Sequence, residues 1–256
     1  MAADGADRPL IVRAEENVVT LTLNRPQARN AVNIDLMFEL EKVLDDLYRD
    51  PPRVIVLDAT PPGFCAGIDL KESREATAEF ARHRVSAMHR VLRKLRLIPV
   101  PVITAVDGVT AGLGTELMIS GDLRFATHGS RFSYPEPRVA VPSPAHRLVW
   151  LVGLTRAQDL LLTARWVDAQ EGERMGLITR VVDDLDAAVA ETIETLRGLS
   201  ALALAMTKEN LWASVQAGSE GASAHHIAGV TLSATTDDRH EALAAFLEKR
   251  PPRFDR

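Results

Sequence analysis

Hydrophobic and polar residues alternate with a period of two near the start of the chain and with a helical period further on. Residues 19–23 alternate apolar and threonine side chains, as in a strand with one buried face. Residues 10–13 lie across a short polar turn from them, which predicts a hairpin. Asn33 precedes an apolar stripe of helical spacing and is expected to cap that helix. The run Val-Ile-Val-Leu at 54–57 is apolar throughout, as in a strand buried on both faces.

Strands and helices continue to alternate over the first half of the chain. A helix is predicted to end near Ile98, followed by strands at 101–106, 123–126 and 131–133. Beyond Pro144 the pattern is mainly helical, with one short strand candidate at 178–182. This order predicts an α/β core, residues 1–190, and a helical C-terminal part, residues 191–256. No flexible linker marks the boundary.

Composition and charge exclude several classes of function. The 256 residues carry 30 Lys and Arg against 35 Asp and Glu, and no basic run is interleaved with aromatic residues, so no nucleic-acid partner is expected. The most basic stretch, 83–96, has apolar residues at helical spacing and predicts an amphipathic helix with a solvated polar face. A single cysteine fits a reducing compartment, and no apolar stretch reaches membrane-spanning length. We therefore expect a cytoplasmic protein with no membrane partner.

Two small-residue turns follow buried strands. The first is GFCAGIDLKE at 63–72, and the second is DGVTAGLGTEL at 107–117. A turn that begins a helix leaves backbone N–H groups free, and the helix dipole adds partial positive charge there. Two such turns can direct two N–H donors at one oxygen, which is the arrangement of an oxyanion hole. A tight turn without a ligand is the alternative for each one alone.

Two glutamates stand out beside these turns. Glu116 lies among apolar residues in the second turn, where burial would raise its pKa toward the range useful for acid–base chemistry. The alternative is a partly exposed glutamate at a helix start, favoured by the dipole. Glu136 lies between two prolines after a short strand, so its backbone is rigid. Its alternative is a turn carboxylate in water.

Together these motifs resemble the crotonase (enoyl-CoA hydratase/isomerase) superfamily, most closely its two-glutamate enoyl-CoA hydratases. FCAGIDLKE resembles the family's first oxyanion-hole segment, FCAGxDL, and VDGVTAGLGTEL resembles the second, NG-x-A-x-GGG-x-E-L. FSYPE resembles F-x-x-PE, and the spacing 136 − 116 = 20 is the register of the two-glutamate hydratases. LNRPQARNAVN and AFLEKRPPRF resemble the family's N-terminal NRP-x-x-x-NA and C-terminal F-x-EKR-x-P-x-F segments. The resemblance spans nearly the whole chain.

The resemblance implies a fold and a reaction. The fold is a crotonase-like spiral ββα core with a helical C-terminal trimerisation part, and members form homotrimers or dimers of trimers. The reaction is syn addition of water to a trans-2-enoyl-CoA, which gives a 3-hydroxyacyl-CoA. The acyl-CoA thioester is the substrate, and neither a cofactor nor a metal is implied.

The resemblance also implies roles for particular residues. The backbone N–H groups of Ile68 and Leu113 would form the oxyanion hole, Glu116 would orient and deprotonate the water, and Glu136 would protonate C2. Lys249 and Phe254 would reach the CoA of a neighbouring subunit. Arg29 and Lys71 are candidate phosphate partners, with exposed solubilising charge as the alternative. Contacts with CoA or substrate are implied for Arg25, Ala28, Arg29, Ala66, Gly67, Asp69, Leu70, Lys71, Gly112, Lys249 and Phe254. Cys65 is expected to be an inert buried thiol.

The sequence departs from the family pattern in two places. Leu113 stands where the family often has the middle one of three glycines, and residues 137–147 contain no glycine where the family has a glycine-rich segment. That segment lines the acyl side of the site in relatives, so substrate size and polarity stay open. Arg138 is expected to be able to pair with Glu136 and lower its pKa. An isomerase that uses Glu136 alone, an acyl-CoA hydrolase and a catalytically weak acyl-CoA-binding protein remain alternatives.

Overall fold

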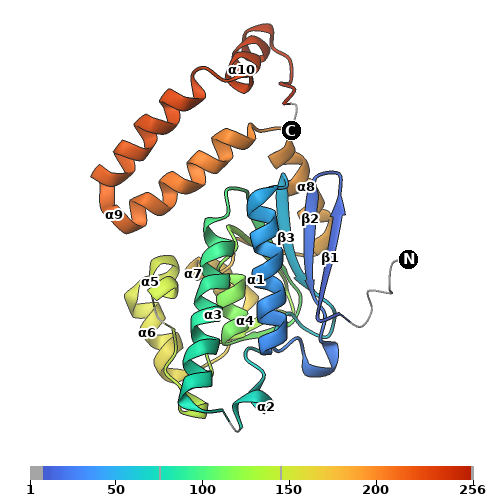
Figure 1. Cartoon of the computed structure of the whole chain (residues 1–256), viewed down its shortest axis with the longest axis vertical. Coiled ribbons are helices and arrows are strands. Elements are labelled where there is room, and N and C mark those ends of the chain that lie inside the picture. Colours follow the sequence, from blue (N-terminus) through green and yellow to red (C-terminus); the bar gives the residue numbers. More distant parts are fainter. Residues whose placement is uncertain (1–7, 75, 145, 255–256) are drawn as a thin grey trace.

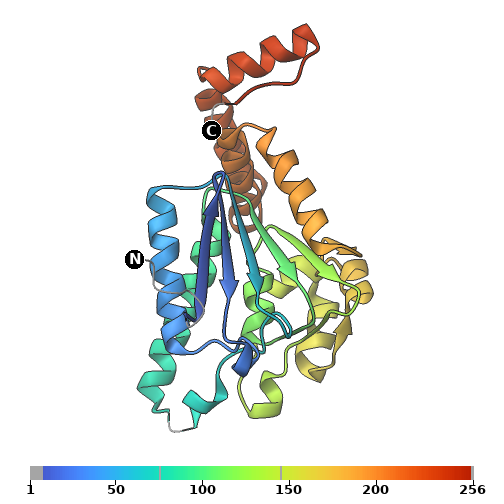
Figure 2. The same ribbon diagram turned by 90° about the vertical axis from the view of Figure 1, so that its right-hand side faces the viewer.

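The central element is a six-stranded sheet with the strand order β1-β2-β3-β4-β6-β9 (Figures 1 and 2). The computed structural model of the chain describes residues 8–74, 76–144 and 146–254. The antiparallel pair β1–β2 is the predicted hairpin, and the other neighbours in this sheet are parallel. The strands are β1 (Leu10–Glu15), β2 (Val18–Leu23), β3 (Val54–Ala59), β4 (Val102–Val106), β6 (Leu123–Thr127) and β9 (Arg180–Val182).

Helices cover both faces of this sheet. On one face, α1 (Ile34–Arg49) and α3 (Ala78–Leu97) lie side by side, and α8 (Leu185–Arg197) lies on the other (Figure 1). Successive residues of β3 point to opposite faces, so Val54 packs toward α8 and Ile55 packs toward α1 and α3. This double burial confirms the prediction made from the continuous apolar run at 54–57. The Asn33 side chain accepts a hydrogen bond from the Leu36 N–H, which confirms the predicted cap of α1.

A second, three-stranded sheet lies beside the first and carries the predicted site. It consists of β5 (Val109–Ala111), β7 (Arg131–Ser133) and β8 (Val167–Asp168), in the order β5-β7-β8. The two-residue strand β8 is too short to leave a pattern in the sequence and was not predicted. An isolated parallel bridge between Cys65 and Thr110 joins the first glycine turn to β5. The second glycine turn leads from β5 into α4 (Leu113–Met118).

The helix α3 differs in part from its sequence-based description. Val85 is 43% exposed, whereas Arg84 and Arg96 on the predicted solvated face are buried. The Arg84 guanidinium donates to Ser73 Oγ at 2.9 Å and lies over the Phe80 ring. Two indole rings cover the Arg96 guanidinium, those of Trp150 and Trp212. The helical period was therefore correct, but neighbouring helices cover part of the polar face.

The C-terminal half is mainly helical, as predicted. After η3 (Glu136–Val139) come α5 (His146–Val152), α6 (Leu154–Thr163) and α7 (Ala169–Met175), which pack beside the core. Because α8 spans residue 190 and packs on the sheet, the change to peripheral helices falls after Arg197. Helix α9 (Ala201–Ser233) bends at Gly218 and is followed by α10 (Asp237–Glu248). In both views α9 and α10 extend from one end of the core (Figures 1 and 2).

Candidate active site

Backbone hydrogen bonds hold the two glycine turns together. The N–H groups of Phe64 and Cys65 both donate to the Val109 carbonyl, at 3.1 and 3.3 Å. In return the Ala111 N–H donates to the Cys65 carbonyl at 2.9 Å. These bonds continue the second sheet into the first turn, so the turns after β3 and after β5 have a fixed relative position.

Gly67 is one point of close approach between the two turns. Its φ is +99°, and a Cβ there would lie 2.9 Å from the Ala111 carbonyl oxygen and 3.6 Å from the Leu113 nitrogen. Only glycine adopts this conformation at this spacing without strain. The residue after Gly67 is Ile68, so the two predicted oxyanion donors come from segments in direct contact.

The N–H groups of Ile68 and Leu113 are both left open by the local structure. Ile68 forms a parallel bridge with Val32, but the bonds of that bridge use the Gly67 carbonyl and the Asp69 N–H. Leu113 is the first residue of α4, so its N–H has no partner one turn earlier in that helix. No hydrogen bond within the described part of the chain occupies either N–H. The geometry fits an oxyanion hole, and binding of a carbonyl by these two amides stays a prediction.

Glu116 is fully buried and held by two side chains. Its Oε2 accepts two hydrogen bonds from the Arg147 guanidinium, one from Nε at 2.8 Å and one from Nη2. Its Oε1 accepts a hydrogen bond from the Tyr134 hydroxyl at 3.1 Å. Arg147 is itself buried, with 4% of its side chain exposed. The buried interpretation of Glu116 is confirmed, and the exposed alternative is wrong.

Glu136 enters the same region from a different segment. It begins η3 and is 9% exposed, so the alternative of a turn carboxylate in water is also wrong. Its Oε2 accepts a hydrogen bond from Ser143 Oγ at 3.2 Å. Its Oε1 lies beside Gly112, where a Cβ would be only 2.9 Å away. Gly112 has φ 53° and ψ −120° and directly precedes Leu113, so Glu136 faces the oxyanion turn.

Burial raises the pKa of both glutamates. For Glu116, the Arg147 charge and the hydrogen bonds from Arg147 and Tyr134 act in the opposite direction, and the charge of Glu136 adds to the upward shift. For Glu136, its own backbone N–H and Ser143 oppose the effect of burial on the pKa. Glu136 therefore contributes to the electrostatic environment of Glu116. Such a pair provides acid–base groups for a reaction close to neutral pH.

Arg138 does not pair with Glu136, so the expected lowering of that pKa is wrong. Its Nη2 instead donates to the Ala164 carbonyl at 3.2 Å. The residues that hold the glutamates are Arg147, Tyr134 and Ser143, and sequence reasoning identified none of them. One signal for Arg147 was available: a cation in the first turn of an apolar helix opposes the helix dipole and therefore suggests an acidic partner.

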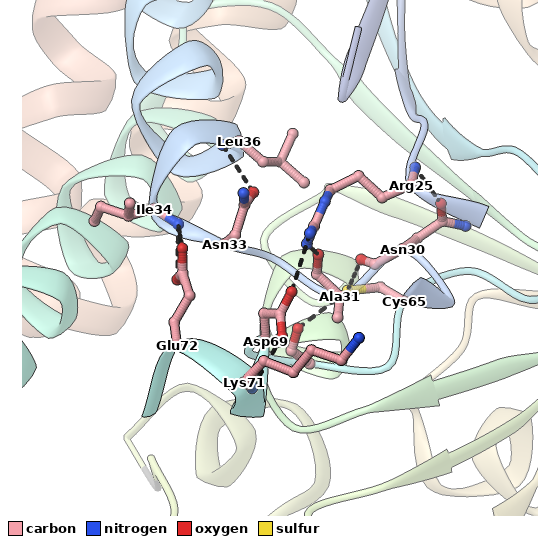
Figure 3. A network of polar contacts seen from close by, with 11 residues as sticks. Arg25, Asn30, Ala31, Asn33, Ile34, Leu36, Cys65, Asp69, Lys71 and Glu72 are labelled. Atoms are coloured by element: carbon pink, nitrogen blue, oxygen red, sulfur yellow. Dashed lines mark hydrogen bonds and ion pairs between the residues drawn. The ribbon is translucent and has the colours of Figure 1, made fainter. Parts of the chain in front are cut away.

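Three of the residues predicted to contact CoA, Arg25, Asp69 and Lys71, lie along the loop after β2 and the first turn (Figure 3). The Ala66 N–H donates to the Arg29 carbonyl at 3.0 Å, which joins these two segments. Arg25 pairs with Asp69 at 3.0 Å, and Asp69 caps α2 (Leu70–Ser73) by accepting a hydrogen bond from the Lys71 N–H. Arg25 and Asp69 therefore also hold the first turn in place. Ala28 ends the short helix η2 (Pro26–Ala28) in the same loop.

Asn30 was not singled out in the sequence, although it lies in the NRP-x-x-x-NA segment. It is fully buried, and its Nδ2 donates to the carbonyls of Thr60 and Gly63 at 2.7 and 3.0 Å. Its Oδ1 accepts a hydrogen bond from the Arg25 N–H at 2.8 Å, as Figure 3 shows. Asn30 thus links the loop after β2 to the residues that lead from β3 into the first turn.

Lys249 and Phe254 are not brought to the site within one chain. Lys249 caps the end of α10, at the opposite end of the molecule from α2 in both views (Figures 1 and 2). Their contact with the CoA of a neighbouring subunit stays a prediction.

Three further observations concern the cysteine, metal binding and membrane-spanning helices among the described residues. Burial raises the pKa of the Cys65 thiol to about 12, so a reactive thiolate does not form at neutral pH. No three His, Cys, Asp or Glu side chains in the described ranges are grouped so that they could hold a metal ion. None of the helices in those ranges combines the length and apolar character needed to cross a membrane.

Comparison with known proteins identifies the family. A family model described as Enoyl-CoA hydratase/isomerase matches residues 13–256. The chain is 34% identical over 251 residues to the probable enoyl-CoA hydratase echA8 of Mycobacterium tuberculosis, covering 96% of this chain and 97% of that protein. It is 31% identical over 248 residues to the short-chain-enoyl-CoA hydratase of Clostridium acetobutylicum, covering 94% and 95%. The crystal structure of an enoyl-CoA hydratase from Mycobacterium smegmatis matches with a TM-score of 0.94 at 31% identity, covering 98% and 100%.

The chain therefore belongs to the enoyl-CoA hydratase/isomerase family, and its fold is the crotonase fold. The predicted fold class, a mixed α/β core with a helical C-terminal part, is confirmed.

Proposed function

We propose that this protein is an enoyl-CoA hydratase, which adds water across the C2–C3 double bond of a trans-2-enoyl-CoA to give a 3-hydroxyacyl-CoA. The observation that carries the proposal is a pair of buried carboxylates at a turn whose amide groups are open: Glu136 lies against Gly112, and Glu116 lies in the helix that begins at Leu113. Relatives named as enoyl-CoA hydratases match the chain over nearly its full length, which supports the same reaction class, a hydro-lyase.

The N–H groups of Ile68 and Leu113 would bind the thioester oxygen. When water attacks C3, negative charge moves to this oxygen, and two fixed donors stabilise it more in the transition state than in the ground state. Loss of one oxyanion-hole donor reduces the rate by about 10²–10³ in other enzymes that stabilise charge in this way. Because both donors belong to the backbone, their position depends on close packing of the two turns at Gly67.

The two glutamates would position the attacking water and transfer the proton. Glu116 would orient and activate the water that attacks C3, and Glu136 would protonate C2. Burial raises the pKa of Glu136, which favours a protonated form that can act as the acid. Glu116 comes from α4 and Glu136 from η3, and in this proposal one water contacts both.

The CoA moiety would lie along the first turn and the loop after β2. Arg29 and Lys71 are cations suited to its phosphates. Lys249 and Phe254 would come from a neighbouring subunit of a homotrimer or a dimer of trimers. The exposed apolar side chains of α9 and α10 support such an assembly: Leu211, Val215, Ile227, Val230, Leu232, Leu243, Phe246 and Leu247. We propose a cytoplasmic location and no cofactor beyond the acyl-CoA substrate.

One observation favours a second reaction, double-bond isomerisation by Glu136 alone. Arg147 and Tyr134 already occupy three acceptor positions of Glu116, whereas one side-chain donor, Ser143, binds Glu136. An isomerase needs one carboxylate that moves a proton between two carbons, and Glu136 is the less constrained of the two.

The test is loss of enoyl-thioester absorbance with crotonyl-CoA and with a longer trans-2-enoyl-CoA. Wild type, Glu116→Gln and Glu136→Gln are compared, and calorimetry checks that each variant still binds the substrate. Hydration by wild type and loss of most of the rate in both variants support the hydratase. Binding without hydration by wild type contradicts it and leaves isomerisation, hydrolysis or binding alone.

A further inference from the structure

The hydrogen bonds on Glu116 limit what this carboxylate can do. Its Oε2 accepts two hydrogen bonds from Arg147, and its Oε1 accepts one from Tyr134. A carboxylate has about four acceptor positions, so one remains, and it is on Oε1. Because Arg147 is buried as well, bulk water has little access to the pair formed by Arg147 and Oε2 of Glu116. A proton placed on Oε2 would break a buried, charge-assisted pair.

We propose that Arg147 and Tyr134 are positioning residues for the hydration, which keep Glu116 a carboxylate and leave it one acceptor position for the attacking water. This inference rests on the proposed hydratase function. Glu116 then orients the water without taking its proton. As the water oxygen bonds to C3, an O–H bond of the water breaks and its proton passes to Glu136. The proton already on Glu136 passes to C2 as the C2–C3 π bond breaks, so one water is added and both carboxyl groups end as they began.

The charges around Glu116 support this division of roles. Burial raises the pKa of Glu116, and the charge of Glu136 adds to this, while Arg147 from α5 and Tyr134 from the segment after β7 lower it. Burial and the neighbouring Glu116 raise the pKa of Tyr134, so its hydroxyl stays a hydrogen-bond donor. If Arg147 is removed, only the Tyr134 hydrogen bond still opposes the effect of burial on the pKa of Glu116. That pKa should then rise, so Glu116 binds a proton at higher pH.

Two further groups face Arg147 from α3. Burial lowers the pKa of His89 and of Arg96, and the charge of Arg147 lowers both further. The positive charge of Arg96 would make an unpaired Arg147 more costly still. The Glu116 carboxylate is therefore the counter-charge of Arg147, which explains a cation in the first turn of α5, against the helix dipole.

The experiment uses the full-length protein with four substitutions. Arg147→Met removes the charge, Arg147→Lys keeps it, and Tyr134→Phe removes only the hydroxyl. Arg138→Met is the matched control, because Arg138 lies in the same segment but donates to the Ala164 carbonyl and to neither glutamate. Two quantities are measured against pH: kcat/KM for crotonyl-CoA, and the ¹³C chemical shift of the Glu116 carboxyl carbon, assigned with Glu116→Gln.

We expect Arg147→Met to move the titration of Glu116 and the acidic limb of kcat/KM upward together by about 1–3 pH units. Its activity at pH 7 should fall roughly 10²-fold and should recover as the pH is raised above the new limb. Arg147→Lys should restore most of the profile. Tyr134→Phe should shift both quantities in the same direction by less, with about a 10-fold loss of activity. Arg138→Met should change neither.

A purely structural role would give a different result. If Arg147→Met lowers activity equally at every pH and the Glu116 titration does not move, the proposal is wrong. If Arg147→Met does not fold, Tyr134→Phe decides, and an unshifted titration of Glu116 overturns the proposal. The ¹³C titration needs no turnover, so it separates failure of this inference from a wild type that proves unable to hydrate crotonyl-CoA.

Discussion

Glu116 accepts three hydrogen bonds from two buried side chains, whereas Glu136 accepts one side-chain hydrogen bond, from Ser143 near the surface. Both carboxylates are buried, and burial raises both pKa values, yet only Glu116 has a cation as partner. Glu116 lies in a helix that is buried throughout, and Glu136 begins a short 3₁₀ helix. The difference indicates how one site can hold a fixed carboxylate and a proton-transferring carboxylate side by side.

The largest expected difference is in how much the protein is destabilised when each glutamate is replaced. Glu116→Leu leaves the Arg147 charge buried without a partner, which should lower the free energy of unfolding by about 3–5 kcal/mol. Glu136→Leu removes the acceptor of the Ser143 hydroxyl and of the Glu136 backbone N–H, but it strands no cation, so it should cost only about 1–2 kcal/mol. Chemical denaturation of both variants measures this. Equal losses of unfolding free energy in the two variants would show that burial of the Arg147 charge does not require Glu116 as its partner.

Replacing each glutamate by aspartate, which is shorter by one methylene group, compares how strongly the activity depends on the position of each carboxylate. Glu136→Asp withdraws the carboxylate from Gly112, and a displacement of this size should reduce kcat roughly 10²-fold without a large change in stability. Glu116→Asp should reduce kcat by a similar factor and also destabilise the fold, because it disrupts the contacts with Arg147 and Tyr134. Kinetics and thermal unfolding are measured on the same samples. A Glu136→Asp variant with wild-type kcat would contradict the role of Glu136.

Gly112 tests how closely Glu136 must approach the oxyanion turn. A Cβ at this residue would lie 2.9 Å from Oε1 of Glu136, and its backbone conformation is one that other residues rarely adopt. Gly112→Ala should therefore lower kcat and cost about 1–3 kcal/mol of stability. Gly129→Ala is the matched control, since a Cβ at Gly129 meets nothing within 4 Å. Equal effects of the two substitutions would argue against close packing at Gly112.

The smallest expected effect is at Ser143. Its hydroxyl stabilises the Glu136 carboxylate and lowers its pKa, against the larger upward effect of burial. Ser143→Ala should raise the pKa of Glu136, so the protonated form persists to higher pH. The limb of the kcat profile that follows Glu136 should move to higher pH by less than about 1 unit. A shift to lower pH would contradict the assignment of Ser143 as a donor to the carboxylate.

Much of the fold could be predicted because its elements have strong local signals. The strand at 54–57 is apolar throughout, Asn33 has a side chain suited to an N-cap, and the two glycine turns follow buried strands. The two-residue strand β8 is too short for any period to show. The helical period of α3 was correct, but its sequence does not reveal that Trp150 and Trp212 cover Arg96.

The sequence predicts the two glutamates of the site, but it does not predict the side chains that bind them. Both Arg138 and Arg147 lie near Glu136 in sequence, and only the tertiary fold decides that Arg147 reaches Glu116 while Arg138 reaches a carbonyl. Tyr134 lies two residues before Glu136, and its hydroxyl nevertheless bonds to Glu116. The roles of Lys249 and Phe254 stay predictions, because they need a second copy of the chain.

One measurement tests the central claim most directly: incubation of crotonyl-CoA with wild type in D₂O, followed by mass spectrometry of the products. We predict 3-hydroxybutyryl-CoA with one deuterium at C2, because the proton delivered by Glu136 comes from solvent. Deuterium in unhydrated enoyl-CoA would instead show proton exchange by an isomerase, and free CoA would show hydrolysis. Either of those results, without hydration, would contradict the hydratase account.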